Sequence, residues 1–275
     1  MTMRITSLFC YPVKGLRGVA TAALQFGPRG PLHDRHWMVV GPDDRFLSQR
    51  STPRMATLNA ALTGAALVLS TDDGQRLDVP LDAGVTPRDV VIWRDTVRAL
   101  DCGDAPARWL TERLGQACRL VHLPPDTVRL LDPKFSPRAD AQTGFADAYP
   151  VLVTNAASLE ALNRDLPRPL GMDRFRPNVV LDGAPAWAED GWRVLQAGAV
   201  TFDLVKPCAR CAVITTDQRT GETPDGPAPL ATLARLHTLP PFGAIFGQNA
   251  VHRGPGTLRL GDEVAVLESQ PTATP

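Results

Sequence analysis

Two cysteines separated by two residues offer the most reactive chemistry in this chain. They lie in the segment Lys-Pro-Cys-Ala-Arg-Cys at 206–211. The cations Lys206 and Arg210 favour the thiolate form of a neighbouring cysteine. A thiolate is the form that acts as a nucleophile or binds a soft metal ion. The segment therefore predicts a nucleophile or a metal ligand at Cys208 or Cys211.

The local pattern also predicts how the two thiols are presented. The β-branched run Val-Ile-Thr-Thr follows directly and is typical of a strand. Side chains three residues apart on a strand point to opposite faces, and Pro207 suits a loop or a strand entry because it lacks an amide N–H. We therefore predict that Cys208 lies on an approach loop and that Cys211 opens a strand over 211–216. Only one of the two thiols is then expected to face a site.

Three other interpretations of this cysteine pair are open. A structural zinc site needs four ligands, and the chain has neither a second Cys-x-x-Cys nor a paired histidine cluster. A thioredoxin-type pair is expected to open a helix inside a βαβ unit, whereas this pair precedes a predicted strand. Two inert cysteines on a barrel loop are the third possibility, and local sequence does not decide against it.

Composition narrows the class of protein. The 275 residues carry 29 cationic and 29 acidic side chains, so the net charge is zero, which argues against binding to nucleic acid or to an anionic membrane. Five sparse cysteines do not form the pattern of a secreted disulfide framework. The N-terminus lacks a signal-peptide pattern, and no apolar run approaches the roughly 18 residues of a membrane span. We therefore expect a soluble, cytoplasmic protein.

The predicted elements are mainly strands. Short strand-like pieces run through the chain, Asp-Asp-Gly at 72–74 indicates a hairpin turn, and helices are expected near 104–115, from Thr154 or Asn155, and over 228–237. Such a set favours a mainly β, α+β protein with a β-barrel or roll. No Gly-x-Gly-x-x-Gly, Walker-type or Gly-x-Ser-x-Gly motif is present, which disfavours those nucleotide-binding and serine-hydrolase folds.

The sequence predicts two domains and a tail. A long irregular stretch begins at Pro124-Pro125 and runs to Pro150, and such stretches are usually functional or disordered. We place a boundary there, with an N-terminal β-rich domain over 1–123 and a β-barrel domain over 124–268. The last residues, 269–275, are expected to be disordered.

Several separate motifs, taken in order, resemble the MOSC proteins of the two-part type, in which an N-terminal MOSC β-barrel domain precedes the MOSC domain. This group includes the amidoxime-reducing components. Any one motif is weak, but the ordered set spans nearly the whole chain. The matching segments are Tyr-Pro-Val-Lys at 11–14, Asp-Arg-His-Trp at 34–37, Phe-Ala-Asp-Ala-Tyr-Pro at 145–150, Phe-Arg-Pro-Asn at 175–178, Trp-Ala-Glu-Asp at 187–190 with Trp192, Lys-Pro-Cys-Ala-Arg-Cys at 206–211 with Thr-Gly at 220–221, and Phe-Gly-Gln at 246–248.

The resemblance implies a pyranopterin molybdenum cofactor whose metal is bound by the second cysteine of the pair, Cys211. A soft thiolate suits a metal that a dithiolene already holds. The resemblance further implies that Lys14, Arg35 and Arg176 bind the phosphate and pterin of the cofactor, for which guanidinium forks are well matched.

By the same resemblance, Arg210, Thr154 and Asn178 are expected to line the pocket, and Asp217 to position or protonate a substrate. The chain also departs from the family pattern. Gly15-Leu16 stands where Ser-Cys is common, Ala209 where Ser is common, and Gln218-Arg219 where Pro-Asp is usual. Two hydroxyl donors to the bound anion are therefore missing.

The implied activity is a molybdenum-dependent oxidoreductase that reduces N-hydroxylated compounds such as amidoximes, hydroxylamines and N-hydroxylated bases. No ferredoxin-type cysteine cluster occurs in the chain, so electrons are expected from a separate ferredoxin or flavin reductase. One alternative is a carrier that holds the cofactor, or sulfur as a persulfide on Cys211, without turnover. Another is a thiol redox protein that uses Cys208 and Cys211 as a disulfide.

Overall fold

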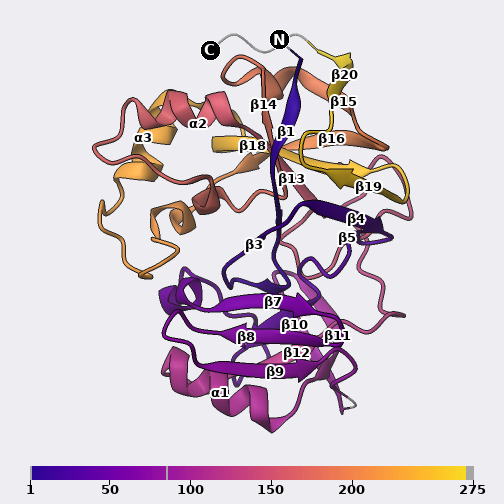
Figure 1. Cartoon of the computed structure of the whole chain (residues 1–275), viewed down its shortest axis with the longest axis vertical. Helices are drawn as coiled ribbons and strands as arrows, with labels where there is room; N and C mark the ends of the chain where they lie inside the picture. The colour runs from indigo at the N-terminus through magenta and orange to yellow at the C-terminus, as the bar shows by residue number, and fades with distance from the viewer. Residues whose placement is uncertain (1, 85, 271–275) are drawn as a thin grey trace.

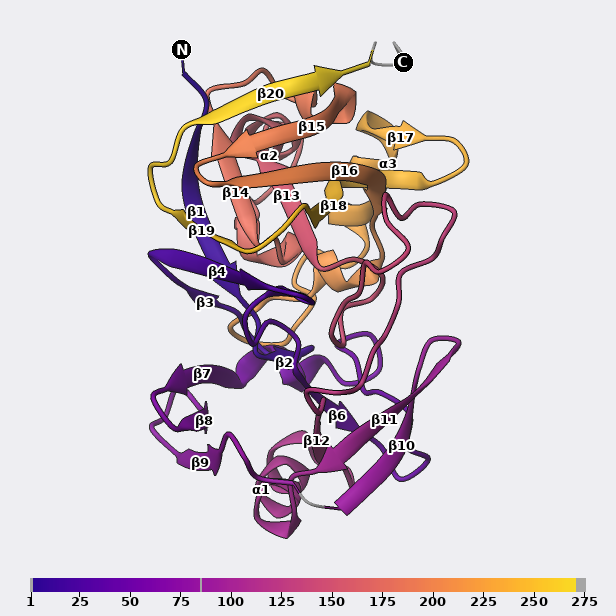
Figure 2. The same ribbon diagram turned by 90° about the vertical axis from the view of Figure 1, so that its right-hand side faces the viewer.

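The computed structural model describes residues 2–84 and 86–270, and its ribbon divides into two parts stacked along the long axis (Figure 1). Within these residues the chain is mainly strand with three α-helices, which confirms the predicted fold class. Strand β1 (Arg4–Cys10) begins and strand β20 (Val264–Ser269) ends at the far end of the upper part (Figures 1 and 2). None of the helices in the described ranges has the length and apolar character needed to span a bilayer.

The upper part is built on one large sheet. In the described residues it has nine strands in the order β20-β15-β16-β18-β13-β14-β1-β3, with β17 paired to β18. Strand β20 also contacts the segment before β1, where the Val264 amide donates to the Met3 carbonyl at 2.9 Å. The strands are β1 (Arg4–Cys10), β3 (Val19–Ala20), β13 (Val151–Asn155), β14 (Val179–Asp182), β15 (Trp192–Ala197), β16 (Val200–Ala209), β17 (Thr238–Leu239), β18 (Gly243–His252) and β20 (Val264–Ser269).

The lower part contains two smaller sheets and a helix that packs beside them (Figure 1). Their orders are β10-β11-β12-β6-β2 and β7-β8-β9, and a third small sheet, β19-β4-β5, lies between the parts (Figure 2). The elements are β2 (Val13–Lys14), β4 (Ala23–Gly27), β5 (Gly30–Pro31), β6 (Trp37–Val40), β7 (Asn59–Thr63), β8 (Ala66–Ser70), β9 (Arg76–Pro80), β10 (Thr86–Ile92), β11 (Asp95–Asp101), α1 (Asp104–Leu114), β12 (Arg119–His122) and β19 (Gly256–Arg259).

The three predicted helices and the hairpin are confirmed. Helix α1 buries Trp109, Leu110 and Leu114 on one face, as the 3.6-residue period predicts. Helices α2 (Ala156–Asn163) and α3 (Ala228–Leu236) begin near the predicted points, and the Asn155 side chain accepts from the Ala157 amide at the start of α2. Gly74 adopts a φ of +90° in the turn between β8 and β9, a conformation that favours glycine.

The predicted strand over 211–216 is wrong. Residues Ala212–Thr215 form a short 3-10 helix, η4, whereas Cys208 lies inside β16 and not on a loop. The Thr215 hydroxyl donates to the Ala212 carbonyl at 2.7 Å, and Ile214 packs in a buried cluster with Phe175. Tertiary packing and a local side-chain hydrogen bond therefore override the β-branched pattern.

Strand pairing crosses the predicted domain boundary at 124. Strand β1 pairs with β14, and β4 pairs with β19, so strands from the first 30 residues pair with strands that follow residue 124. The division into 1–123 and 124–268 stays a prediction. Within the predicted tail, Ser269 ends β20 and the Gln270 amide donates to the Gly191 carbonyl at 2.8 Å, while 271–275 lie outside the described residues.

Candidate functional site

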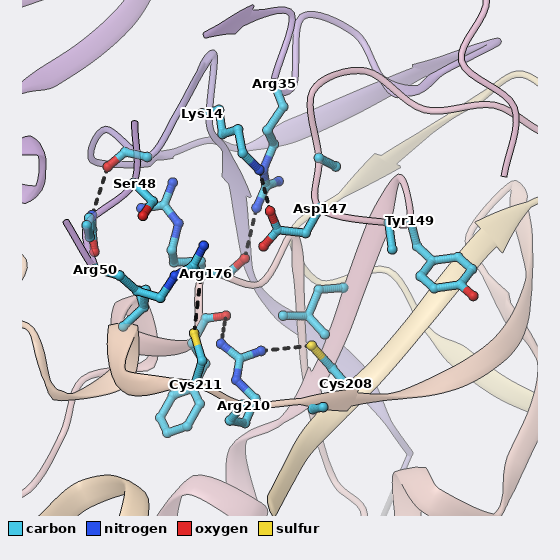
Figure 3. Close-up of a pocket in the computed structure, with 18 of the residues that line it drawn as sticks. Lys14, Arg35, Ser48, Arg50, Asp147, Tyr149, Arg176, Cys208, Arg210 and Cys211 are labelled. Atoms are coloured by element: carbon cyan, nitrogen blue, oxygen red, sulfur yellow. Dashed lines mark hydrogen bonds and ion pairs between the residues drawn. The ribbon is translucent and has the colours of Figure 1, made fainter. Parts of the chain in front are cut away.

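A cavity of about 170 Å³ gathers most of the predicted site residues (Figure 3). Its wall comes from widely separated segments, mainly within 14–15, 46–50, 146–149, 175–178 and 208–213. Of the predicted residues, it is lined by Lys14, Arg35, Arg176, Asn178, Arg210 and Cys211. Thr154 and Asp217 are not among the lining residues.

Both cysteines of the pair line this cavity, so the prediction that only one thiol faces the site is wrong (Figure 3). They are reduced, and each sulfur has its own guanidinium donor in the described structure. Arg210 Nη1 lies 2.9 Å from Cys208 Sγ, and Arg50 Nη1 lies 3.6 Å from Cys211 Sγ. Cys211 is the exposed member of the pair. Strand β16 ends at Ala209, so Cys211 lies on the turn between β16 and η4.

The two cations that flank the cysteines in sequence are not equivalent in space. The Lys206 ammonium lies 4.4 Å from the centre of the Phe135 ring and 5.7 Å from that of Phe242, and Lys206 is not a lining residue. Arg210 contacts Cys208, and the cation beside Cys211 is Arg50, from a distant segment. The positive charge near Cys211 is therefore a product of the fold.

Arg176 provides a guanidinium nitrogen that the protein does not use. Its backbone adopts the left-handed conformation, with φ +56°, at the end of the 3-10 helix Met172–Phe175. The guanidinium stacks 4.4 Å from the centre of the Tyr11 ring, and Nη1 is buried without a hydrogen-bond partner in the described residues. Burial lowers the pKa of Arg176 to about 10. An unpaired buried donor of this kind is costly unless a ligand accepts from it.

A second unused donor belongs to Arg210. Its Nη1 and Nη2 bind Cys208 Sγ and the Phe175 carbonyl, the latter at 2.9 Å. Its Nε is buried and has no partner within the part of the chain that the structure describes. Arg176 and Arg210 therefore present two buried guanidinium donors in the wall of one cavity.

Arg35 serves mainly to hold the wall together. Its Nη1 donates to Asp34 and, at 3.1 Å, to Asn178 Oδ1, while its Nη2 donates to the Arg176 carbonyl at 3.1 Å. The side-chain amide of Asn178 in turn donates to Asp34 Oδ1 at 3.1 Å, and the backbone amide of Tyr11 donates to the same oxygen at 2.8 Å. This buried network sets the position of the Arg176 backbone and leaves little of the Arg35 fork for a ligand.

Lys14 and Asp147 form an ion pair near Arg35, on the side of the cavity that faces the two cysteines (Figure 3). Burial lowers the pKa of Lys14, and the charge of Asp147 opposes that shift. Enclosure would raise the pKa of Asp147, but the charge and hydrogen bond of Lys14, with a hydrogen bond from Trp93 Nε1 at 3.0 Å, outweigh it. The pKa of Asp147 therefore lies well below its usual range, and the carboxylate is ionised.

Two of the predicted residues support the site from outside it. Thr154 is fully buried in β13, where its hydroxyl donates to the Val179 carbonyl at 3.4 Å. Asp217 accepts from Arg174 Nη2 at 2.9 Å, and Arg174 Nη1 donates to the carbonyls of Ile214 and Thr215. Asp217 therefore anchors the segment that follows Cys211.

The departures from the family pattern have visible consequences. Gly15 has φ +84°, and a Cβ there would lie 2.6 Å from Met55 Cε, so the serine that is common at this position does not fit without rearrangement. Gly15 and Ala209 both line the cavity without offering a side-chain donor. Gln218 is buried against Gln49 and is not a lining residue.

Sequence reasoning missed two residues of the site, Asp147 and Arg50. Asp147 belongs to the motif at 145–150, within the long irregular stretch for which a function was one of two expectations, so a signal was present. Arg50 follows β6 in a loop without a recognisable motif, and only the fold brings it to Cys211. Neither residue could be assigned a partner from local spacing.

The arrangement suits an anionic ligand that contains a soft metal. Five cations and one carboxylate line the cavity, and three of the cations, Arg50, Arg176 and Arg210, have no carboxylate partner within residues 2–84 and 86–270. In the same residues no three His, Cys, Asp or Glu side chains gather into a metal site. The exposed thiol of Cys211 can complete the coordination of a metal that another group already holds.

The chain belongs to the MOSC family. The family model described as the MOSC N-terminal beta barrel domain matches residues 2–117, and that of the MOSC domain matches 140–265. The mitochondrial amidoxime-reducing component 1 of Homo sapiens is 33% identical, and that of Mus musculus 32%, each over 96% of this chain and 82% of the relative. A molybdenum cofactor sulfurase of Danio rerio is 31% identical over 78% of this chain and 28% of its own length.

Proposed function

We propose that this protein is a molybdenum-cofactor-dependent oxidoreductase that reduces N-hydroxylated compounds, with amidoximes as the leading substrates. The observation that carries this proposal is the unpaired guanidinium nitrogen of Arg176 in the wall of the cavity that also holds the exposed thiol of Cys211. A pyranopterin molybdenum group requires a hydrogen-bond donor to its phosphate anion and a thiolate ligand for its metal. The amidoxime-reducing relatives supply the reaction class.

The residues present fit this cofactor. Lys14, Arg176 and Arg210 would hold its phosphate and pterin, and Arg35 would act chiefly by fixing the Arg176 backbone. Cys211 would be the protein ligand of the metal, and Arg50 Nη1 lies 3.6 Å from its sulfur. When bound, the cofactor would supply the two-electron chemistry that the side chains cannot. Without hydroxyls at 15 and 209, binding of the anion relies on guanidinium and backbone donors.

Reduction of an N–OH group to N–H consumes two electrons and two protons and releases water. In this proposal the chain binds and orients the substrate beside Cys211, and solvent that reaches the cavity supplies protons. Asp217 acts through Arg174, which fixes the carbonyls of the segment after the thiol. In this proposal electrons come from a separate ferredoxin or flavin reductase.

The first test compares molybdenum content in the wild type, Cys211→Ala and Cys208→Ala, all made in a cofactor-competent host with added molybdate. We expect near-stoichiometric metal in the wild type and in Cys208→Ala, and loss of metal from Cys211→Ala. The loaded wild type, given a ferredoxin or flavin reductase system, should then reduce benzamidoxime. Equal loss of metal in both cysteine variants would contradict the assignment of Cys211 as the single ligand.

A carrier function is the second candidate. The exposed thiol of Cys211 and the match to a molybdenum cofactor sulfurase favour a protein that holds the cofactor, or sulfane sulfur, for delivery. A carrier would retain the metal yet reduce no N-hydroxylated substrate with any donor. A sulfur carrier would also release sulfane sulfur that disappears in Cys211→Ala.

A further inference from the structure

Asp147 is the one carboxylate among the described residues that line the cavity. Its side chain is 65% exposed, although it pairs with a buried lysine. The carboxylate faces the solvent of the cavity while its neighbours form the wall. A surface of this kind, otherwise rich in cations, gains nothing for anion binding from an exposed negative charge. The position of Asp147 therefore calls for a separate role.

The hydrogen bonds of Asp147 leave one oxygen open. Lys14 Nζ and Trp93 Nε1 both donate to Oδ1, and Oδ2 accepts from no group in the described chain. Figure 3 shows this second oxygen turned toward the part of the cavity that contains Arg176. An ionised carboxylate oxygen in this position can accept an N–H from a ligand.

The neighbouring structure holds Asp147 in place. Arg129 is buried, and its guanidinium donates to the carbonyls of Gly144, Ala146 and Asp147. Trp93 has φ +55° at the turn between β10 and β11, a backbone conformation that residues other than glycine rarely adopt. Its indole is 45% exposed, and the indole N–H donates to Asp147 Oδ1 at 3.0 Å.

We propose that Asp147 is the substrate-anchoring residue of this site, and that its open oxygen accepts an N–H from the amidine-type head of the ligand. This inference rests on the proposed function. An amidoxime head offers N–H donors, and the amidine that its reduction yields is a cation, so a fixed carboxylate favours both. Phe46 also lines the cavity, with its ring 5.1 Å from the Lys14 ammonium and 5.2 Å from the Trp93 ring, and supplies an apolar surface for the remainder of the molecule.

Asp147 could instead serve only to hold Lys14 for the anion, and binding experiments separate the two roles. Benzamidine is a planar cation with N–H donors on both sides of its head, and benzamide is its neutral counterpart of nearly the same shape. Calorimetric titration of both ligands into molybdenum-loaded wild type, Asp147→Asn and Asp140→Asn tests the charge directly. Asp140 is the matched control, because it lies on the same segment with a side chain 84% exposed.

We expect wild type and Asp140→Asn to bind benzamidine at least tenfold more tightly than benzamide, which corresponds to about 1.4 kcal/mol. Asp147→Asn should lose this preference and keep its molybdenum. Its KM for benzamidoxime should rise more than its kcat falls. The inference would be overturned if Asp147→Asn kept the full preference for benzamidine. It would also be overturned if Asp147→Asn lost molybdenum while the molecules that remained loaded kept that preference.

The binding and turnover measurements test the anchor and the proposed reaction separately. If the wild type shows Asp147-dependent binding of benzamidine but reduces no N-hydroxylated compound, the anchor stands and the proposed reaction falls. If benzamidoxime is reduced at the same KM and kcat by Asp147→Asn, the reaction stands and the anchor falls.

Discussion

Glu189 shows how burial controls charge at the level of one residue. The side chain is fully buried beside the first turn of α2, where Oε2 accepts from Ser158 Oγ at 2.9 Å and from Asn155 Nδ2 at 3.2 Å. Its Oε1 has no partner in the described residues. Burial raises the pKa of Glu189 to about 7, with Ser158 opposing the shift and Asp190 adding to it. The folded protein therefore holds a proton here that the unfolded chain releases near pH 4.5.

This shift predicts a pH-dependent stability. Between about pH 4.5 and 7 the folded state binds the proton and the unfolded state does not, so the contribution of Glu189 to stability falls as pH rises. Glu189→Gln removes the charge and keeps the acceptor. We expect it to raise the free energy of unfolding at pH 8 by on the order of 1–3 kcal/mol and to change it little at pH 5.

Thermal unfolding at pH 5 and pH 8 measures this difference. Glu160→Gln is the control, since Glu160 lies at an exposed position of α2, and this substitution should change stability by the same amount at both pH values. An equal effect of Glu189→Gln at both pH values would show that the carboxyl does not titrate in this range.

Arg129 holds together the segment from 124 to 150, which has almost no regular secondary structure. The segment from 124 to 150 contains one isolated bridge, between Leu130 and Gln142, and is otherwise irregular in the structure. Arg129 Nε donates to Asp95 Oδ2 at 2.7 Å, and its Nη atoms donate to the carbonyls of residues 144, 146 and 147. One buried guanidinium replaces the hydrogen-bond ladder that a strand would have supplied.

We expect Arg129→Lys to lower the free energy of unfolding by about 1–3 kcal/mol, because an ammonium cannot satisfy this fork of carbonyls. Amide exchange over 144–147 should become faster than in the wild type. Arg98→Lys, at an exposed position of β11, is the control and should match the wild type in both measurements. Unchanged exchange in Arg129→Lys would show that other contacts hold the loop.

On the scale of the whole molecule, a reciprocal amide pair joins the two parts of the structure. The side-chain amide of Gln49 donates to Gln218 Oε1 at 3.0 Å, and that of Gln218 donates to Gln49 Oε1 at 2.9 Å. Both residues are only 2% exposed. The second donor of Gln49 binds the Gly15 carbonyl at 2.9 Å, and Arg17 Nε binds the Gln218 carbonyl at 2.8 Å. The pair thus fixes the loop after Lys14 against the segment after Cys211.

A double-mutant cycle should reveal coupling across this junction. Gln49→Leu or Gln218→Leu alone leaves a buried amide without its partner, which costs about 1–3 kcal/mol. The double variant should lose at least about 1 kcal/mol less than the sum of the single losses, because two apolar side chains can face each other. Denaturant unfolding of the four proteins provides the values, and strictly additive losses would mean that the two amides do not act together.

Most residues of the candidate site were predicted through the resemblance of the ordered motifs to the MOSC proteins, and residue chemistry alone singled out only the cysteine pair. Lys14, Arg176 and Cys211 do line one cavity, although they lie far apart in sequence. The helices were also predictable, since a 3.6-residue apolar period and an Asn cap are local signals. The strand at 211–216 was mispredicted because packing can override β propensity. Here η4 buries Ile214 in a cluster with Phe175 and Phe246.

By itself, the sequence determined the types of group available to the site, the three helices and the mainly β class, since these follow from side-chain chemistry and local periodicity. Only the tertiary structure decided which groups meet. It brings Arg50 to Cys211, places Asp147 beside Lys14, and leaves Asp217 outside the cavity on Arg174. The reason is physical: charge and hydrogen bonding act over a few ångströms of space, and strand pairing between distant segments sets those distances.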